Sequence, residues 1–150
     1  MRCPVCNFKS TRVVDSRLLS DGQGVRRRRE CEKEKCGFRF STVEEIELLD
    51  VTVVKRNGKR EAYSREKLIN GLKQALQKRP YTDIQLQHLV HAIERDIQKI
   101  RGGELTSTEI GEIVMKRLRT FDKVAYIRFA SVYRSFEDVG AFAKELKNIS

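Results

Sequence analysis

The sequence predicts an α+β protein, with a small N-terminal β domain followed by a mainly helical domain that begins with a β-hairpin. Three observations lead to this prediction. All four cysteines lie in the first quarter of the chain, and short β-type runs alternate with turn residues up to residue 43. After residue 64, apolar residues recur at helical spacing.

The composition is that of a folded, basic protein. The 150 residues include 31 Lys+Arg and 21 Asp+Glu, which gives a formal charge of +10. A hydrophobic share of 39% beside 35% charged residues excludes wholesale disorder. No apolar run approaches the roughly 18 residues of a membrane span, and no signal peptide opens the chain. We therefore expect a cytoplasmic protein without a membrane partner, whose charge suits a polyanion such as nucleic acid.

The charge is distributed unevenly and indicates a domain boundary. Residues 1–43 hold 11 basic and 5 acidic side chains, whereas residues 44–50 hold four acids and no base. Residues 51–150 hold 20 basic and 12 acidic side chains. The sequence accordingly predicts four segments, namely a first domain at 1–45, an acidic linker at 46–50, a second domain at 51–141 and a C-terminal tail at 142–150.

The cysteines form two close pairs, Cys3 with Cys6 and Cys31 with Cys36. In a reducing compartment such pairs indicate a metal site rather than disulfides, and buried thiols without a metal are the alternative. Four thiolates complete the tetrahedral shell that zinc prefers, so no position remains for a reactive water. A segment of about 40 residues rarely folds alone without a metal or disulfide. We expect one structural zinc ion per chain, held by two zinc knuckles.

Between the cysteine pairs, short runs predict strands around the turn cluster at 21–24. One run contains four consecutive arginines, which alternate in a strand, so Arg26 and Arg28 face one way and Arg27 and Arg29 the other. Guanidinium groups suit phosphate oxygens and guanine edges. We predict a nucleic-acid-binding patch, which further basic residues could extend: Lys9, Arg12, Arg17 and Arg39. A solvated charged face is the alternative, as is an RNA-binding or RNA-polymerase-associated ribbon that uses the same arginines.

The second domain begins with a predicted hairpin, in which Asn57-Gly58 separates residues 51–54 from residues 61–63. Four helices follow, because each apolar stripe is preceded by a capping residue. These caps are Ser64, Thr82 with Gln85, Thr106 with Glu109, and Asp122. Pro80 ends the first helix, and the glycines at 102–103 mark a break before the third.

Cations gather around the predicted hairpin. Lys55 and Arg56 end its first strand, Lys67 lies in the first turn of the next helix, and Glu61 lies between them. Cations near a helix N-terminus can hold a triphosphate, although charged edges that deter aggregation fit the residues equally well. The chain has no Gly-x4-Gly-Lys-Ser/Thr loop and no paired-carboxylate array for metal-assisted phosphoryl transfer. A nucleotide here would be sensed and not hydrolysed, so we expect no enzyme.

Several motifs resemble those of the NrdR family, bacterial repressors of ribonucleotide reductase genes. They are Cys3-Pro-Val-Cys6, Asp15-Ser-Arg17, Val25-Arg-Arg-Arg-Arg, Phe38-Arg-Phe-Ser-Thr, Val53-x-Lys-Arg-x-Gly, Arg65-Glu-Lys-Leu68, Lys78-Arg-Pro80, Ile110-Gly-Glu-Ile-Val-Met115 and Val124-Ala-Tyr-Ile-Arg-Phe-Ala-Ser-Val-Tyr133. The resemblance covers nearly the whole chain and implies a zinc ribbon joined to an ATP-cone. It also implies that ATP and dATP bind as regulatory ligands, set the homo-oligomer and thereby control affinity for double-stranded promoter DNA, at paired boxes upstream of ribonucleotide reductase operons.

The resemblance also implies a set of nucleotide-binding residues: Val53, Lys55, Arg56, Glu61, Lys67, Thr106, Tyr126, Arg128 and Tyr133. The sequence departs from the family at the second cysteine pair, where four residues, Glu32–Lys35, replace the usual two. An enzyme, such as a nucleotidase or a reductase fragment, is the alternative from another class. The missing catalytic carboxylates and the absence of cysteines after residue 36 argue against it.

Overall fold

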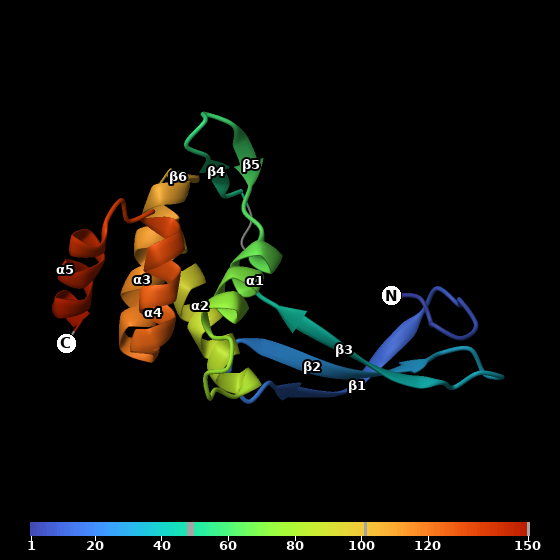
Figure 1. Ribbon diagram of the computed structural model, residues 1–150. Coiled ribbons are helices and arrows are strands. Elements are labelled where there is room, and N and C mark those ends of the chain that lie inside the picture. Colours follow the sequence, from blue (N-terminus) through green and yellow to red (C-terminus); the bar gives the residue numbers. More distant parts are fainter. Residues whose placement is uncertain (48–49, 101, 150) are drawn as a thin grey trace. The chain divides into compact units, whose positions relative to one another are not determined.

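The computed structural model describes residues 1–47, 50–100 and 102–149, and the chain divides into two units (Figure 1). The ribbon unit is Met1–Glu47 and the helical unit is Leu48–Ser150. The first contains strands and the four cysteines, and the second is mostly helical, so the α+β prediction is confirmed. The predicted acidic linker at 46–50 includes residues 48–49, which lie outside the described residues.

The ribbon unit is a three-stranded antiparallel sheet. Its strands are β1 (Thr11–Leu18), β2 (Gly24–Cys31) and β3 (Arg39–Glu45), with β2 in the centre. Cys3 and Cys31 are the buried hydrophobic residues among those described in this unit. Because a sheet with no apolar core is unstable alone, the cysteine cluster must supply the stability that a core supplies elsewhere.

The helical unit begins with the predicted hairpin, formed by β4 (Thr52–Val54) and β5 (Arg60–Ala62). Gly58 has a φ of +80°, the left-handed conformation that the tight turn requires. A third strand, β6 (Glu104–Thr106), pairs with β4 in parallel and completes a sheet with the order β5-β4-β6. The sequence did not predict β6, because three residues that pair with a strand about fifty positions earlier carry no local signal.

Each predicted helix begins at its predicted cap. The helices are α1 (Arg65–Ala75), α2 (Asp83–Lys99), α3 (Ser107–Phe121) and α4 (Lys123–Tyr133), capped by Ser64, Thr82, Thr106 and Asp122. Both predicted capping boxes are formed, at Thr82 with Gln85 and at Thr106 with Glu109. The apolar faces of the four helices meet in one core. Its largest fully buried side chains are Leu72, Leu76, Ile93, Ile97, Met115 and Leu118.

The C-terminal residues form a further helix. This helix, α5 (Val139–Ile149), contains most of residues 142–150, which the sequence analysis set apart from the second domain as a C-terminal tail. Glu145 and Ile149 are 7% and 8% exposed, and Phe142 packs edge-on against Phe136 with ring centroids 5.6 Å apart. The physical reason is that this segment is amphipathic and has a surface to cover. Among the described residues, no helix combines the length and apolarity needed to cross a membrane.

Candidate functional site

The four cysteines of the ribbon unit converge on one point. Their Sγ atoms all lie within 4.8 Å of one another. The Sγ atoms of Cys3 and Cys36 are 3.9 Å apart, and those of Cys6 and Cys31 are 3.6 Å apart. A disulfide would require about 2.05 Å, whereas the edge of a tetrahedron with Zn–S bonds of about 2.3 Å is about 3.8 Å. The cluster therefore has the dimensions of a closed four-thiolate zinc site.

The two cysteine turns share one backbone design. In the first, the N–H of Cys3 donates to the carbonyl of Phe8 at 2.9 Å, and in the second the N–H of Cys31 donates to the carbonyl of Phe38 at 2.9 Å. The residue after the second cysteine is left-handed in both, with φ of +56° at Asn7 and +55° at Gly37. Since the return hydrogen bond and the left-handed residue are the same, the four residues at 32–35 lengthen the second turn without opening the cluster.

Hydrogen bonding within the first turn favours a thiolate. The backbone N–H of Cys6 lowers the pKa of Cys3 to about 7, whereas burial raises the pKa of Cys31 to about 12. A metal ligand must be deprotonated, so the hydrogen bond to Cys3 favours the form of this thiol that binds a metal.

One face of the ribbon sheet carries most of the predicted DNA-binding arginines. Residues directly opposite each other on neighbouring strands point to the same face. The register places Arg17 opposite Arg26, and Glu30 opposite both Arg12 and Arg39. Together with Arg28, which alternates with Arg26 along β2, five arginines share this face, and all five are exposed. We call it the arginine face; its members are Arg12, Arg17, Arg26, Arg28 and Arg39.

A β-bulge makes this gathering possible. Arg12 and Arg17 are five positions apart, so regular alternation would point them to opposite faces. The register shifts between Val13 and Asp15, which inserts one extra residue into β1. Because a bulge reverses the alternation beyond it, Arg12 and Arg17 end on the same face.

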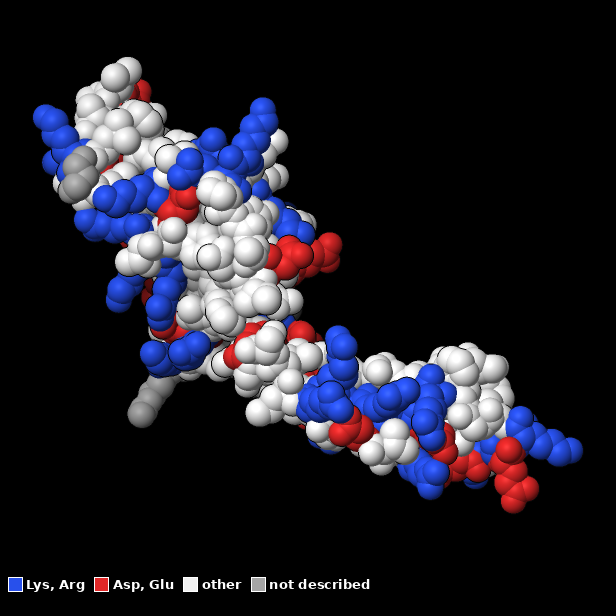
Figure 2. Space-filling model, turned by 90° about the horizontal axis from the view of Figure 1, so that it is seen from below, with Lys and Arg blue, Asp and Glu red and all other residues white. Residues whose placement is uncertain are grey.

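The arginine face is partly neutralised from within. Glu30 accepts hydrogen bonds from Arg12 at 2.8 Å and Arg39 at 2.7 Å, and these two guanidinium groups hold the pKa of its carboxyl below the usual range. Arg17 pairs with Asp15 at 2.9 Å. Arg26 and Arg28 have no hydrogen-bond or ion-pair partner within the described ranges, so they are the arginines most available to a ligand. Basic side chains with acidic ones among them cover the sheet in Figure 2.

Arg27 and Arg29 lie on the opposite face and are half-buried. Arg27 contacts Ser16 at 3.4 Å and Glu44 at 3.5 Å, and Arg29 contacts Thr42 at 3.4 Å. These two side chains therefore make contacts within the sheet. The geometry agrees with the expectation that only half of the four consecutive arginines face any one surface.

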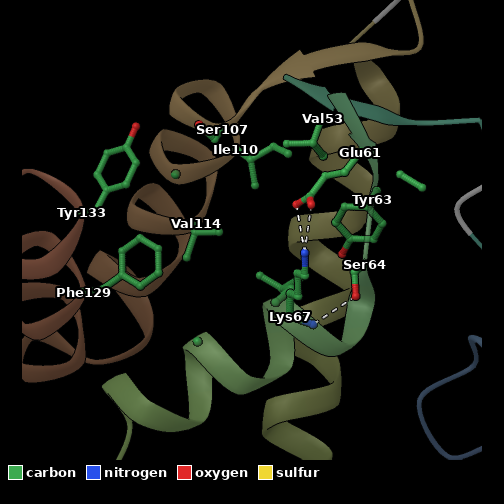
Figure 3. A pocket seen from close by; sticks show the side chains of 14 residues that line it. Val53, Glu61, Tyr63, Ser64, Lys67, Ser107, Ile110, Val114, Phe129 and Tyr133 are labelled. Carbon is green, nitrogen blue, oxygen red and sulfur yellow. Dashed lines mark hydrogen bonds and ion pairs between the residues drawn. The ribbon is translucent and has the colours of Figure 1, made fainter. Parts of the chain in front are cut away.

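The helical unit contains a cavity of about 220 Å³ between the hairpin, α1, α3 and α4. One side of it is charged and the other is apolar. Figure 3 shows Glu61 and Lys67 on one side, and the rings of Phe129 and Tyr133 on the other. The N-terminal ends of α1 and α3 also reach it, through the α1 cap Ser64 and the first residue of α3, Ser107. Helix N-termini favour anions, so the cavity combines a polar, charged end with an apolar end.

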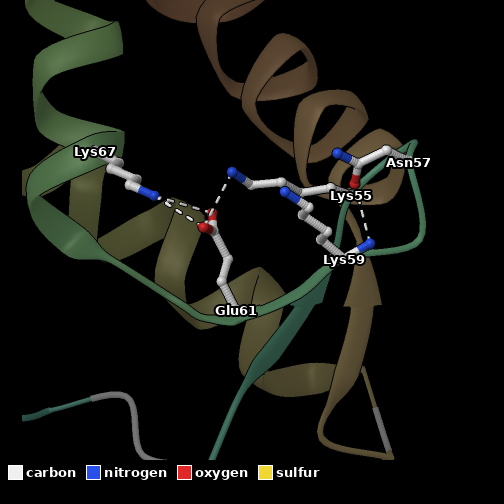
Figure 4. A network of polar contacts seen from close by, with 5 residues as sticks. All are labelled: Lys55, Asn57, Lys59, Glu61 and Lys67. Carbon is white, nitrogen blue, oxygen red and sulfur yellow. Dashed lines mark hydrogen bonds and ion pairs between the residues drawn. The ribbon is translucent and has the colours of Figure 1, made fainter.

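A three-residue ion network forms the charged side. Glu61 accepts from Lys67 at 3.0 and 3.1 Å and pairs with Lys55 at 3.1 Å (Figure 4). The hydrogen bond with Lys67 lowers the pKa of the Glu61 carboxyl most, and the one with Lys55 lowers it further. Glu61 therefore stays ionised. The structure thus holds two ammonium groups near one point, where a polyphosphate could replace the carboxylate as their partner.

Not every predicted nucleotide residue lines this cavity. Val53, Glu61, Lys67 and Tyr133 line it. Arg56 lies beside it, where its guanidinium donates to the carbonyl of Tyr133 at 3.0 Å and lies 5.7 Å from the centre of that ring.

Of the remaining four, Lys55 does not line the cavity but pairs with the cavity-lining Glu61. The other three lie elsewhere. Thr106 caps α3, next to the cavity-lining Ser107. Arg128 lines a second cavity of about 290 Å³ and donates to the carbonyls of Ala75 and Gln77 at 3.3 and 2.6 Å. Tyr126 is buried and donates to Glu145 of α5. It is not among the residues that line the cavity.

Several lining residues were missed by the sequence prediction. They are Ala62, Tyr63, Ser64, Leu68, Gly71, Ser107, Ile110, Gly111, Val114 and Phe129. The helix pattern assigned half of them to caps or to the core. These residues form a cavity because elements distant in the sequence come together. A local sequence pattern cannot reveal that.

The chain is similar to known proteins along its whole length. The family model described as ATP cone domain matches residues 51–139, and the one described as transcriptional repressor NrdR-like, N-terminal domain, matches residues 1–44. The transcriptional repressor NrdR of Lysinibacillus sphaericus is 52% identical over 149 residues, covering 99% of this chain and 94% of the relative. Those of Listeria innocua and Lacticaseibacillus casei are 50% and 49% identical over 149 residues, covering 99% of this chain and 96% and 95% of the relative.

Proposed function

Because the chain belongs to the NrdR family of transcriptional repressors, we propose that it represses bacterial ribonucleotide reductase operons in response to nucleotides. The ribbon unit binds promoter DNA, and ATP or dATP in the helical unit controls the homo-oligomer and hence the affinity for DNA. The relatives are named as repressors, which is a regulatory and non-enzymatic role. The observation that carries the proposal is one chain that holds both an exposed arginine face and a separate cavity with a cationic end.

The arginine face supports the DNA-binding half. Five exposed guanidinium groups share a surface with three carboxylates, Asp15, Glu30 and Glu45, so the face is positively charged overall. Phosphate contacts fix a protein on the duplex, and an arginine that reaches the major groove can donate both its N–H groups to guanine. Arg26 and Arg28 are the proposed principal contacts, with Arg12, Arg17 and Arg39 at the flanks.

One structural zinc ion per chain holds this face in place. The four cysteines fit its tetrahedral shell by distance, and neither strand pair has an apolar core beneath it. The zinc ion supplies stability and no chemistry, since a closed thiolate shell leaves no open position.

The cavity supports the nucleotide-binding half. Lys67 and Lys55 are placed to pair with phosphate oxygens, in exchange for Glu61. The rings of Phe129 and Tyr133 offer an apolar surface at the other end, where the nucleoside can rest. A ligand with a polyanionic end and a flat aromatic end matches this division, and both ATP and dATP have that form.

Regulation requires that the two nucleotides favour different assemblies. A ligand that binds all assemblies equally well shifts none of them, however tightly it binds. The decisive experiment measures the mass of the zinc-loaded protein in solution with ATP, with dATP and with neither, and repeats the series with a promoter duplex. The proposal expects both the assembly size and the DNA affinity to change between ATP and dATP. If neither changes, the proposed function is wrong.

A further inference from the structure

We infer that Gly111 is a positioning residue of the nucleotide cavity. Because Gly111 has no side chain, the ring of Tyr133 can pack directly against α3. The inference rests on the proposed nucleotide binding and identifies what shapes the apolar end of that site.

The space at Gly111 is already taken by Tyr133. A Cβ atom built on Gly111 would lie 2.1, 2.3 and 2.7 Å from Cε2, Cζ and Cδ2 of that ring. Carbon atoms in contact prefer about 3.5–4.0 Å. Even alanine therefore cannot occupy this position unless the ring moves by more than an ångström.

The backbone gives no other reason for a glycine here. Gly111 lies within α3 and is not among the residues with positive φ. Glycine is a poor helix former, so a helix interior by itself favours alanine. The neighbouring glycine of the cavity wall, Gly71, has nothing within 4 Å of its Cβ position. The close approach of the ring distinguishes Gly111.

The ring is held from its other sides as well. The hydroxyl of Tyr133 donates to the carbonyl of Thr108 at 2.6 Å, one turn before Gly111 on α3. The ring stacks on Phe129 with centroids 5.9 Å apart and planes 20° apart, and Arg56 lies 5.7 Å from its centre. A displaced ring would lose the hydroxyl bond and at least one of these two contacts.

Displacement would change the cavity itself. Tyr133 and Phe129 line both the cavity of about 220 Å³ and the neighbouring one of about 290 Å³. Figure 3 places the Tyr133 ring at the apolar end, across the cavity from Glu61 and Lys67. A methyl group at position 111 would thus alter the apolar end while leaving the charged end untouched.

The test is a double-mutant cycle in the full-length, zinc-loaded protein. Four proteins are compared: wild type, Gly111→Ala, Tyr133→Ala and the variant with both changes. Calorimetric titration gives the affinity for ATP and for dATP, and thermal unfolding without nucleotide gives stability. Gly140→Ala is the matched control, because it makes the same change in another helix, outside the cavity, where the Cβ meets only an Asp138 carboxylate oxygen at 3.2 Å.

If Gly111 acts through Tyr133, Gly111→Ala weakens nucleotide binding about tenfold, and adding it to Tyr133→Ala changes affinity by less than about twofold. The thermal midpoint should show the same non-additivity. Unchanged binding by Gly111→Ala, or losses that add in the double variant, would overturn the inference. A wild-type protein that binds neither ATP nor dATP would instead refute the proposed function.

Discussion

Replacing Arg26 and Arg28 with alanine should weaken DNA binding in a way that depends on salt. Both side chains are exposed on the arginine face, and neither has a partner among the described residues. Their removal therefore breaks no internal contact of the sheet, and the variant should keep its zinc and its fold.

The magnitude follows from counterion release. Each phosphate contact contributes about 0.9 to the slope of log affinity against log salt, so two lost contacts per chain reduce the slope by about 1.8. Over a fourfold rise in salt, from about 50 to 200 mM, this corresponds to about a twelvefold difference. Wild-type affinity should thus fall about twelve times further than the affinity of the variant over that range.

The assay is fluorescence anisotropy with a promoter duplex at a series of salt concentrations. The matched control is the variant with Arg27 and Arg29 replaced by alanine, which removes the same charge from the opposite, half-buried face. Its slope should remain within about 0.5 of wild type, because those guanidinium groups contact Ser16, Glu44 and Thr42. A wild-type slope in Arg26→Ala/Arg28→Ala, or equal losses in both variants, would refute the assignment of the DNA-binding face.

Three further predictions test the remaining parts. Chelation of zinc should unfold Met1–Glu47 and leave the helical circular dichroism of Leu48–Ser150 in place, since only the second unit has a large apolar core; metal analysis should find one zinc per chain, and far less with all thiols intact would contradict the site. Lys67→Met should weaken ATP binding about tenfold or more, as expected for loss of a charged hydrogen bond, and calorimetry showing unchanged affinity would exclude Lys67 from the site. Asp96→Asn should lower the free energy of unfolding by about 1 kcal/mol at pH 7, discounted for partial exposure. Arg117 donates to Asp96 at 2.6 and 2.8 Å and lowers its pKa from 3.8, so this stabilisation is present above pH 3.8 and disappears as the pH falls through the lower folded value. Denaturant titrations of wild type and variant should converge at that acidic pH, and a constant difference would contradict the ion pair.

The sequence predicted the elements whose signals are local. Thr82 with Gln85 and Thr106 with Glu109 form capping boxes within one helical turn, and Asn57-Gly58 forms its hairpin from adjacent residues. The cysteine spacing likewise predicted a cluster whose four thiols do converge.

Features that depend on distant partners were missed. The strand β6 forms because it pairs with β4. The ring of Tyr133 packs against α3 because the residue facing it there, Gly111, has no side chain. The bulge between Val13 and Asp15, which reverses the alternation of β1, left no signal in the sequence. The helix Val139–Ile149 was not predicted either, because its contact with the rest of the bundle is not visible in the sequence.

The shared backbone of the two cysteine turns bears on how such domains can diversify. The returning hydrogen bond and the left-handed residue fix each pair of thiolates, so the residues between the cysteines are free to change in number. In the second turn those residues are Glu32, Lys33, Glu34 and Lys35, whose charges cancel. Extra length in this loop thus leaves the returning hydrogen bond and the left-handed residue in place, and the four residues found here add no net charge to the domain.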